Sequence, residues 1–296
     1  MVALTIGLIL IAGFLSALSH GRSLFATNES LAWLQDTNRH AMSVLVPDIE
    51  HAGFYGFAGN GIRVMSLPAG IDACGADFAL ALDRPVQASN DRWPDVGPRC
   101  VPTGSAGGAR VGTDTLTLRH ASFAAAAAHA GRLQVYSRRL ESQTPIDLFA
   151  DGRAPGAVSE NHEVRDLEVR TYYIANDSVG RPGWPALRVK ALTESSGAAQ
   201  FRDEEVTPGV EDLQVELGVA GGDGRAQYVA PDADAARTRP IVAVRLWLRI
   251  RADRTEAGFR DARPLAYAGR EFRPSADEAR HRRMLVERTV ALRNLP

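Results

Sequence analysis

The stretch that decides the fold is Met1-Val-Ala-Leu-Thr-Ile-Gly-Leu-Ile-Leu-Ile-Ala-Gly-Phe-Leu-Ser-Ala-Leu18, which contains no charged residue. A helix of this length rises about 27 Å, close to the thickness of one hydrocarbon core. The sequence therefore predicts that residues 1–18 form the transmembrane half of a helix. A secretory signal peptide is the alternative, but such peptides have a basic start and a shorter apolar core, and nothing basic precedes Leu4.

From residue 19 to residue 53 the apolar residues thin to a stripe, which predicts an amphipathic half of the same helix. The candidate packing residues on this stripe are Leu24, Leu31, Leu34, Leu45 and Ile49. Together with Ala41 and Ala52 they are spaced by three, four or seven, which places them on one face. Because of Pro47 we expect the helix to kink near residues 43–47 but to continue beyond them, with Gly53 as its C-terminal cap.

Residues 54–110 have no sustained period and are rich in glycine and proline, which is typical of an irregular loop region. The only two cysteines, Cys74 and Cys100, fall in this region, without histidine or further cysteine at metal-binding spacing. In an exported protein these two cysteines are candidates for a disulfide bond. Two unpaired buried thiols are the alternative.

After Val111 the apolar period changes to two, and residues 111–296 are predicted to form an antiparallel β-sheet domain that packs on the helix. Gly221–Gly224 is expected to connect a hairpin, and the alanine-rich segment 121–130 to form a short helix, because alanine has the highest helix propensity. The seven expected strands lie near residues 116–118, 133–136, 166–176, 187–191, 213–219, 241–251 and 284–293.

Composition and motifs give no indication of catalysis or of nucleic-acid binding. The net charge is −1, and all but one of the 34 basic residues are arginines, which we interpret as coding bias. There is no phosphate-binding loop, nucleophile elbow or dinucleotide fingerprint. Asp223, Asp232 and Asp234 have the spacing of turn residues rather than of a calcium loop. We therefore expect no enzyme activity, no cofactor and no metal.

Both ends of the helix resemble the N-terminal helix of type IV pilins, in particular the PilW-type minor pilins. The resemblance rests on the run Met1 to Leu10 and on Asp48-Ile49-Glu50-His51-Ala52-Gly53-Phe54. Three later segments, 170–176, 209–219 and 286–294, are similar to core β-segments of that family. The resemblance is weakest between residues 56 and 110.

This resemblance implies an α+β, type IV pilin-like fold and the role of a minor pilin in the initiation and assembly of the type IV pilus. The implied partners are other minor pilins, the major pilin and a tip adhesin, and the implied functions of the fibre are cell adhesion and twitching motility. The chain would cross the inner membrane once, with its C-terminal domain in the periplasm, and would enter the fibre on assembly. The small residues Gly7, Ala12, Gly13 and Ala17 would permit close approach of neighbouring helices.

The family's mature helix opens with Phe-Thr-Leu-Val-Glu-Leu after a short basic leader. The resemblance therefore predicts that the natural protein begins about 10 to 20 residues upstream of Met1. Two alternatives in function stay open. One is a minor pseudopilin of a type II secretion system. The other is a membrane-anchored periplasmic binding or enzymatic domain, which should have a concave pocket with convergent polar groups and a helix detached from the sheet.

Overall fold

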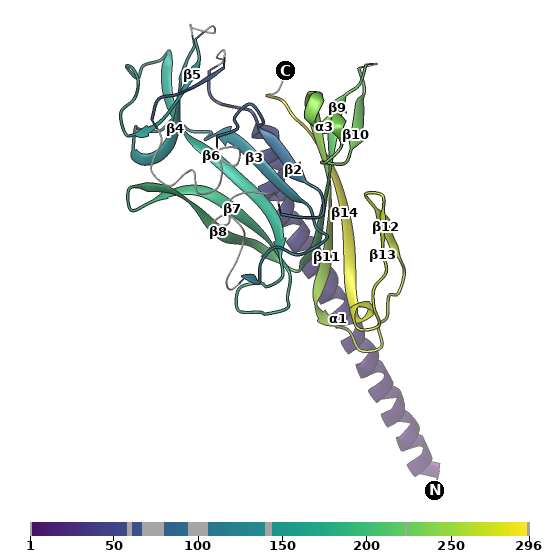
Figure 1. Cartoon of the computed structure of the whole chain (residues 1–296). Coiled ribbons are helices and arrows are strands. Elements are labelled where there is room, and N and C mark those ends of the chain that lie inside the picture. The colour runs from purple at the N-terminus through teal and green to yellow at the C-terminus, as the bar shows by residue number, and fades with distance from the viewer. Residues whose placement is uncertain are drawn as a thin grey trace.

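The computed structural model describes residues 2–57, 61–66, 80–93, 106–139, 144–222 and 224–294. One long helix, α1 (Val2–His51), carries two β-sheets along its C-terminal half, while its N-terminal half projects beyond them (Figure 1). The α+β fold expected from the sequence is confirmed.

Helix α1 has 50 residues and is therefore about 75 Å long. It continues through Pro47, as the spacing of the apolar stripe predicts. Gly53 follows the helix with a φ of 82°, a conformation that glycine adopts without strain. Its amide donates to the carbonyl of Arg119 at 3.0 Å, so the chain turns directly onto the first sheet.

The first sheet has eight strands in the order β1-β5-β4-β6-β3-β2, and β7 and β8 extend it from the second half of β6. Strand β6 is long enough to pair with β3 on one side and with β4 and then β7 on the other. The strands are β1 (Ile62–Val64), β2 (Val86–Ser89), β3 (Thr115–Ala121), β4 (Ala130–Arg138), β5 (Ile146–Asp151), β6 (His162–Ala175), β7 (Ala186–Ser195) and β8 (Ala198–Pro208).

The second sheet has four antiparallel strands in the order β10-β9-β11-β14, and a small hairpin, β12-β13, is separate from it. These strands are β9 (Val210–Ala220), β10 (Ala226–Val229), β11 (Ile241–Thr255), β14 (His281–Ala291), β12 (Leu265–Tyr267) and β13 (Arg270–Phe272). Between them lie the short helix α3 (Asp234–Thr238) and the 3-10 turn η4 (Glu278–Arg280).

The chain crosses from the first sheet to the second at Gly209, between β8 and β9. Gly209 has a φ of 83°, its amide donates to the carbonyl of Pro185 at 2.7 Å, and its carbonyl accepts from the amide of Arg251 at 2.8 Å. A Cβ atom at this position would lie 2.1 Å from the ring of Trp33 on α1. The crossing point therefore requires glycine, because the helix packs directly against it.

All seven predicted strands are present, and so is the hairpin between β9 and β10. Several features differ from the sequence-based expectation. The pairing of β1 with β5 is parallel, and strands β1 and β2 lie within the region 54–110 that was expected to be irregular. Both are short strands of three and four residues, too short to give a recognisable period.

The expectation of a helix over residues 121–130 was wrong. Ala121 ends β3, Ala130 begins β4, and the residues between them are extended or bent. The amides of Ser122 and Ala126 donate to the carbonyls of Asp166 and Val164, at 2.7 and 2.8 Å. Hydrogen bonding to β6 therefore overrides the helix propensity of alanine.

Candidate functional site: the N-terminal helix and its packing on the sheets

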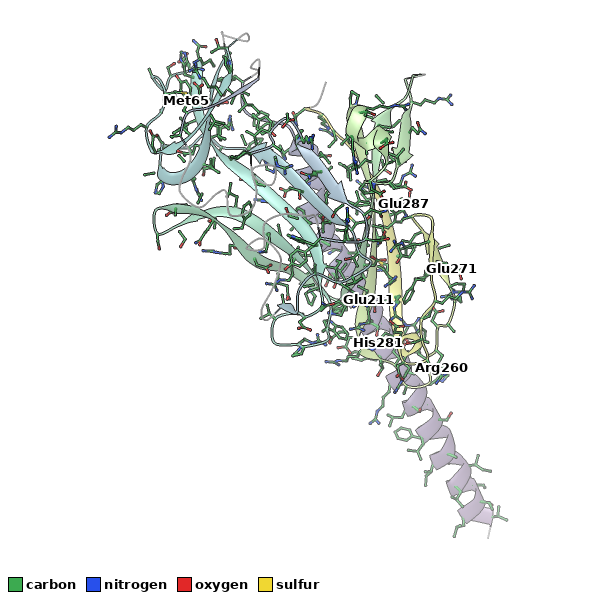
Figure 2. All side chains as sticks on the ribbon, viewed as in Figure 1. Met65, Glu211, Arg260, Glu271, His281 and Glu287 are labelled. Atoms are coloured by element: carbon green, nitrogen blue, oxygen red, sulfur yellow. The ribbon has the colours of Figure 1, made fainter. Side chains whose placement is uncertain are left out.

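The projecting half of α1, residues 2–25, is mainly apolar and exposed in the isolated chain. All its large apolar side chains have exposed fractions between 43% and 73%. It is long and apolar enough to cross a membrane, and none of the most apolar 18-residue window is buried. Figure 2 shows its side chains standing out from the helix with no sheet beside them. Such a surface requires an apolar environment supplied from outside the chain.

The packed half of α1, residues 30–52, lies where the two sheets meet. Its buried side chains form one hydrophobic core with residues of both sheets, including Leu116 and Tyr172 of the first and Leu246 of the second. Strands β11 and β14 make the most extensive contacts with the helix. The buried apolar positions on the helix are Leu34, Ala41, Leu45 and Ile49, and Ala52 directly after the helix is buried as well.

The five candidate packing residues therefore fall into two groups. Leu34, Leu45 and Ile49 have exposed fractions of 1% or less and lie in the core between the sheets. Leu24 and Leu31 are 60% and 39% exposed and face outward from the isolated chain. Cys74 and Cys100, the candidates for a disulfide bond, and the turn residue Asp223 lie outside the described residues. The disulfide bond and the role of Asp223 in the turn therefore stay predictions.

A polar contact marks the point where the helix leaves the sheets. Thr27 Oγ1 donates to Glu256 Oε2 at 2.9 Å, and the guanidinium of Arg282 donates to both oxygens of the same carboxylate, at 2.6 and 3.0 Å. Burial would raise the pKa of Glu256, but Arg282 and the hydroxyls of Thr27 and Ser30 outweigh it and lower that pKa. The helix is thus fixed at the boundary between its two halves.

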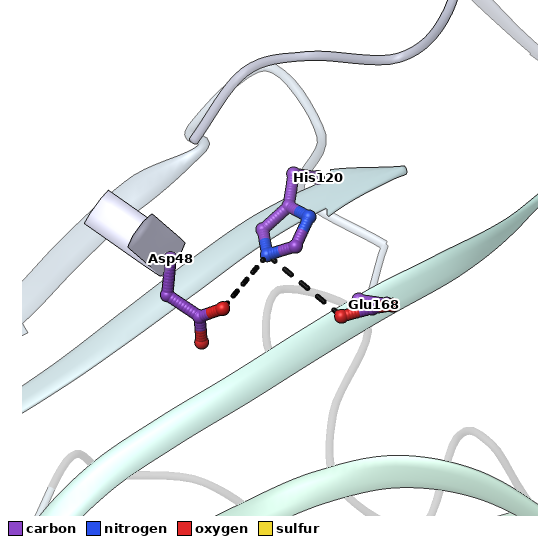
Figure 3. Close-up of side chains that lie close together, drawn as sticks. All are labelled: Asp48, His120 and Glu168. Atoms are coloured by element: carbon purple, nitrogen blue, oxygen red, sulfur yellow. Dashed lines mark ion pairs between the residues drawn. The ribbon is translucent and has the colours of Figure 1, made fainter. Parts of the chain in front are cut away.

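A second polar contact fixes the other end of the packed half and is formed by Asp48, His120, Glu168, Arg170 and Tyr172, which we call the Asp48 network. Arg170 Nη1 donates to Asp48 Oδ1 at 2.6 Å, and the hydroxyl of Tyr172 donates to Asp48 Oδ2. Arg170 Nη2 lies 2.7 Å from Glu168 Oε2. His120 Nε2 lies 3.5 Å from Asp48 Oδ1 and 4.0 Å from Glu168 Oε2 (Figure 3). The network joins α1 to β3 and β6.

The charges of the Asp48 network are mutually supporting. Burial by itself would raise the pKa of Asp48, but His120, Arg170 and Tyr172 outweigh it and hold the pKa below its usual value. Burial would lower the pKa of His120, but Asp48 and Glu168 outweigh it and raise that pKa. The imidazole Nδ1 lies 3.0 Å from the carbonyl of Ala121, which leaves Nε2 facing the two carboxylates. An imidazolium therefore suits this position.

Three members of the network, Asp48, His120 and Glu168, place one ligand atom each within 4.8 Å of one another, as a metal site would. The chemistry does not fit a cation, however, because Arg170 already bridges Asp48 Oδ1 and Glu168 Oε2 with its two terminal nitrogens. A metal bound to these oxygens would lie beside a guanidinium. We therefore interpret the network as an ion-pair cluster that holds the helix.

One residue of this network, Asp48, could have been recognised from its position on the helix. Asp48 lies three residues after Leu45 and four before Ala52, so it falls on the buried face of the helix. A carboxylate on a buried face requires a partner. Its partners lie 72 to 124 residues away along the chain, so periodicity could not identify them.

A second buried ion cluster covers the face of the four-stranded sheet that is turned away from the helix. Glu211 accepts from Arg283 at 2.7 and 2.9 Å and from Arg249 at 3.1 Å. Arg249 also lies over the ring of Phe272 from the β12-β13 hairpin. Figure 2 labels Glu211 on this sheet, with Glu271 on the hairpin beside it. Some of the arginines interpreted as coding bias therefore have a structural role.

Two comparisons with known proteins gave matches. Residues 171–294, from the middle of β6 to the end of β14, match the family model of type IV pilus-assembly protein W. This confirms the PilW resemblance over under half of the chain. A type IV-like pilin of Thermus thermophilus matches in structure with 16% identity and a TM-score of 0.38, covering 88% of this chain and 98% of the other. No curated protein matches. Over residues 171–294 the chain is similar to a family of type IV pilus-assembly proteins.

Proposed function

We propose that this protein is a minor pilin that takes part in initiating and assembling the type IV pilus. In this role the projecting half of α1 packs against the helices of other minor pilins and of the major pilin. The domain lies in the periplasm before assembly and at the surface of the fibre, where it can meet a tip adhesin, afterwards. We assign it no catalytic step and no cofactor.

The observation that carries the proposal is the continuity of α1. The helix runs without interruption from an exposed apolar half into a half that is fixed in the core by Leu34, Leu45 and Ile49. Each large apolar side chain transferred from lipid into water would cost about 1.5–3 kcal/mol. The projecting half is therefore stable in a bilayer or among other apolar helices. A rigid helix lets the fixed domain follow it from one environment to the other.

Small residues give the projecting half a face for close helix contact. Gly13, Ala17 and Gly21 are spaced by four, so they lie on the same side of α1. A Cβ atom added at Gly13 or Gly21 would meet no atom within 4 Å in the isolated chain. A larger side chain at Gly13 is thus neutral for the fold but would hold a neighbouring helix away.

The test is Gly13→Leu, expressed in place of the natural gene, with Ile11→Leu as the matched control. Gly13→Leu should be found in the membrane fraction at the normal level, because the change is apolar and favours a helix. Sheared pili should become much fewer than with Ile11→Leu. Equal piliation by the two strains would refute the proposal. Loss of protein secretion with intact pili would favour the pseudopilin alternative instead.

A further inference from the structure

Strand β2 leaves one edge of the eight-stranded sheet open. It pairs with β3 only, and no other strand of the described part of the chain pairs with its second edge. The carbonyl of Pro85 accepts from the amide of Arg119 at 2.9 Å, so the hydrogen-bonded positions of this ladder are the odd-numbered ones. The N–H and C=O groups of Val86 and Ala88 therefore point away from β3, in the direction in which a further strand would add.

A groove of about 790 Å³ runs along this open edge. Strand β2 forms one wall, and α3 with the beginning of β11 forms the other, so the groove lies between the two sheets. Its apolar lining, which includes Val86, Leu217 and Ile241, belongs to the central core of the protein. Val86 and Leu217 are 3% exposed and form the floor of the groove, while Ile241 is partly exposed. An edge strand beside a groove with an apolar floor is the arrangement that accepts an extended peptide.

The charges around the groove favour an acidic occupant. Four arginines line it, namely Arg84, Arg92, Arg237 and Arg239, against the two aspartates Asp83 and Asp232. Arg84 lies just before β2 and Arg237 lies on α3, so positive charge is present on both walls. A strand whose outward residues are acidic could place them toward both walls while its apolar residues cover the core.

We propose that the β2 groove binds an extended, acidic segment of a partner protein, which adds to the sheet as a strand next to β2. The backbone of Val86 and Ala88 supplies the hydrogen bonds, the core residues receive alternate apolar side chains, and the arginines select for acidic ones. This site is separate from the projecting half of α1 and does not depend on what that half packs against.

The probe is a fluorescein-labelled eight-residue peptide of alternating valine and glutamate, added to the full chain in detergent micelles and followed by fluorescence anisotropy. Two control peptides carry lysine in place of glutamate, or N-methyl groups at alternate amides. The key variant is Ala88→Pro, which removes an outward N–H but keeps the pairing of β2 with β3. Arg237→Glu, on the exposed surface of α3, is a second variant that does not touch the sheet.

The acidic peptide should bind saturably, and Ala88→Pro and the N-methylated peptide should each weaken binding by about fivefold or more, since each removes a hydrogen bond. Arg237→Glu should weaken it as well, and added salt should do the same. Equal binding of the lysine peptide, or no saturable binding below about 1 mM, would overturn the proposal. The proposal would also be overturned if polyphosphate bound as tightly as the acidic peptide and Ala88→Pro left that binding unchanged. The groove would then bind anions without pairing a strand.

Discussion

Replacing Asp48 by asparagine should lower the free energy of unfolding by about 2–4 kcal/mol. The side chain keeps its shape but loses its charge at a position where it is 5% exposed. In the native protein its carboxylate accepts from Arg170 and Tyr172 and faces His120 at 3.5 Å. Asparagine can still accept with its one oxygen.

The expected loss is therefore one charge-assisted hydrogen bond together with the attraction to His120. Arg170 keeps its contact with Glu168 at 2.7 Å and is about one-third exposed, so water compensates part of its loss. The assay is thermal unfolding of the full chain in detergent, in which the melting temperature should fall by about 5–10 °C. Asp36→Asn is the matched control. It is the same substitution on the same helix, in an exposed pair with Arg39, and should change little.

The pH dependence makes the test specific. The raised pKa of His120 means that its stabilising effect is complete below about pH 6.5 and is lost as the pH rises through the folded-state value. Burial raises the pKa of Asp114 to about 7, so this group adds a decline of its own that continues through pH 7. The contribution of Asp114 is the same in the native chain and in the variant, so a smaller decline between pH 7 and pH 9 in Asp48→Asn belongs to His120.

A cavity-forming variant on the same helix face provides the comparison. Leu45→Ala should cost about 2–5 kcal/mol, because Leu45 is completely buried, but it should leave the slope between pH 7 and pH 9 unchanged. If Asp48→Asn unfolds at the same temperature as the native chain, or has the same slope as Leu45→Ala, the ion-pair interpretation of the network is wrong.

Three further predictions concern other parts of the molecule. Gly209→Ala should destabilise the protein by about 2–4 kcal/mol, since it adds strain at a positive φ and a clash with the helix; an unchanged melting temperature would show that the crossing tolerates a side chain. Glu211→Gln should lower the free energy of unfolding by about 3–5 kcal/mol, because Arg283 and its neighbours lose their buried carboxylate. The pKa of Glu211 is lowered in the folded protein, so the native chain should lose this stabilisation only as the pH falls below about 4. If acid unfolds the native chain and the variant at the same pH, this role of Glu211 is wrong. Cys74 and Cys100 should pair after export, so mass measurement of alkylated, unreduced protein should find no free thiol, whereas two alkylated cysteines would refute the pairing.

Periodicity predicted the parts of the fold in which one face is buried. The strand at residues 241–251 was clear because Val244, Leu246, Leu248 and Ile250 all enter the central core. Strand β8 was missed because it is polar, with 202–205 reading Arg-Asp-Glu-Glu, and is specified by its pairing with β7 rather than by an apolar face. Strand β5 was missed because it is buried on both sides and does not alternate.

The sequence predicted the extent of the helix better than it predicted which of its residues contact the sheets. The stripe identified Leu34, Leu45 and Ile49, but it also included Leu24 and Leu31, which are exposed in the isolated chain. The apolar stripe has the same period in the projecting half and in the packed half of α1. Where the packed half begins is therefore decided only by how far the sheets extend along the helix. The contacts of Asp48 and Thr27 join residues more than 70 positions apart, which no local pattern encodes.

The central claim, that the projecting half of α1 packs against other pilin helices, is tested most directly by photo-crosslinking in intact pili. A benzophenone side chain would replace Leu10 or Phe14, which are 68% and 67% exposed, and for comparison Leu45, which is buried. Illumination of purified fibres should join the first two variants to pilin partners through their N-terminal helices, while the third should give crosslinks only within its own chain. Absence of the protein from purified pili, or the same crosslinks from all three positions, would contradict the account.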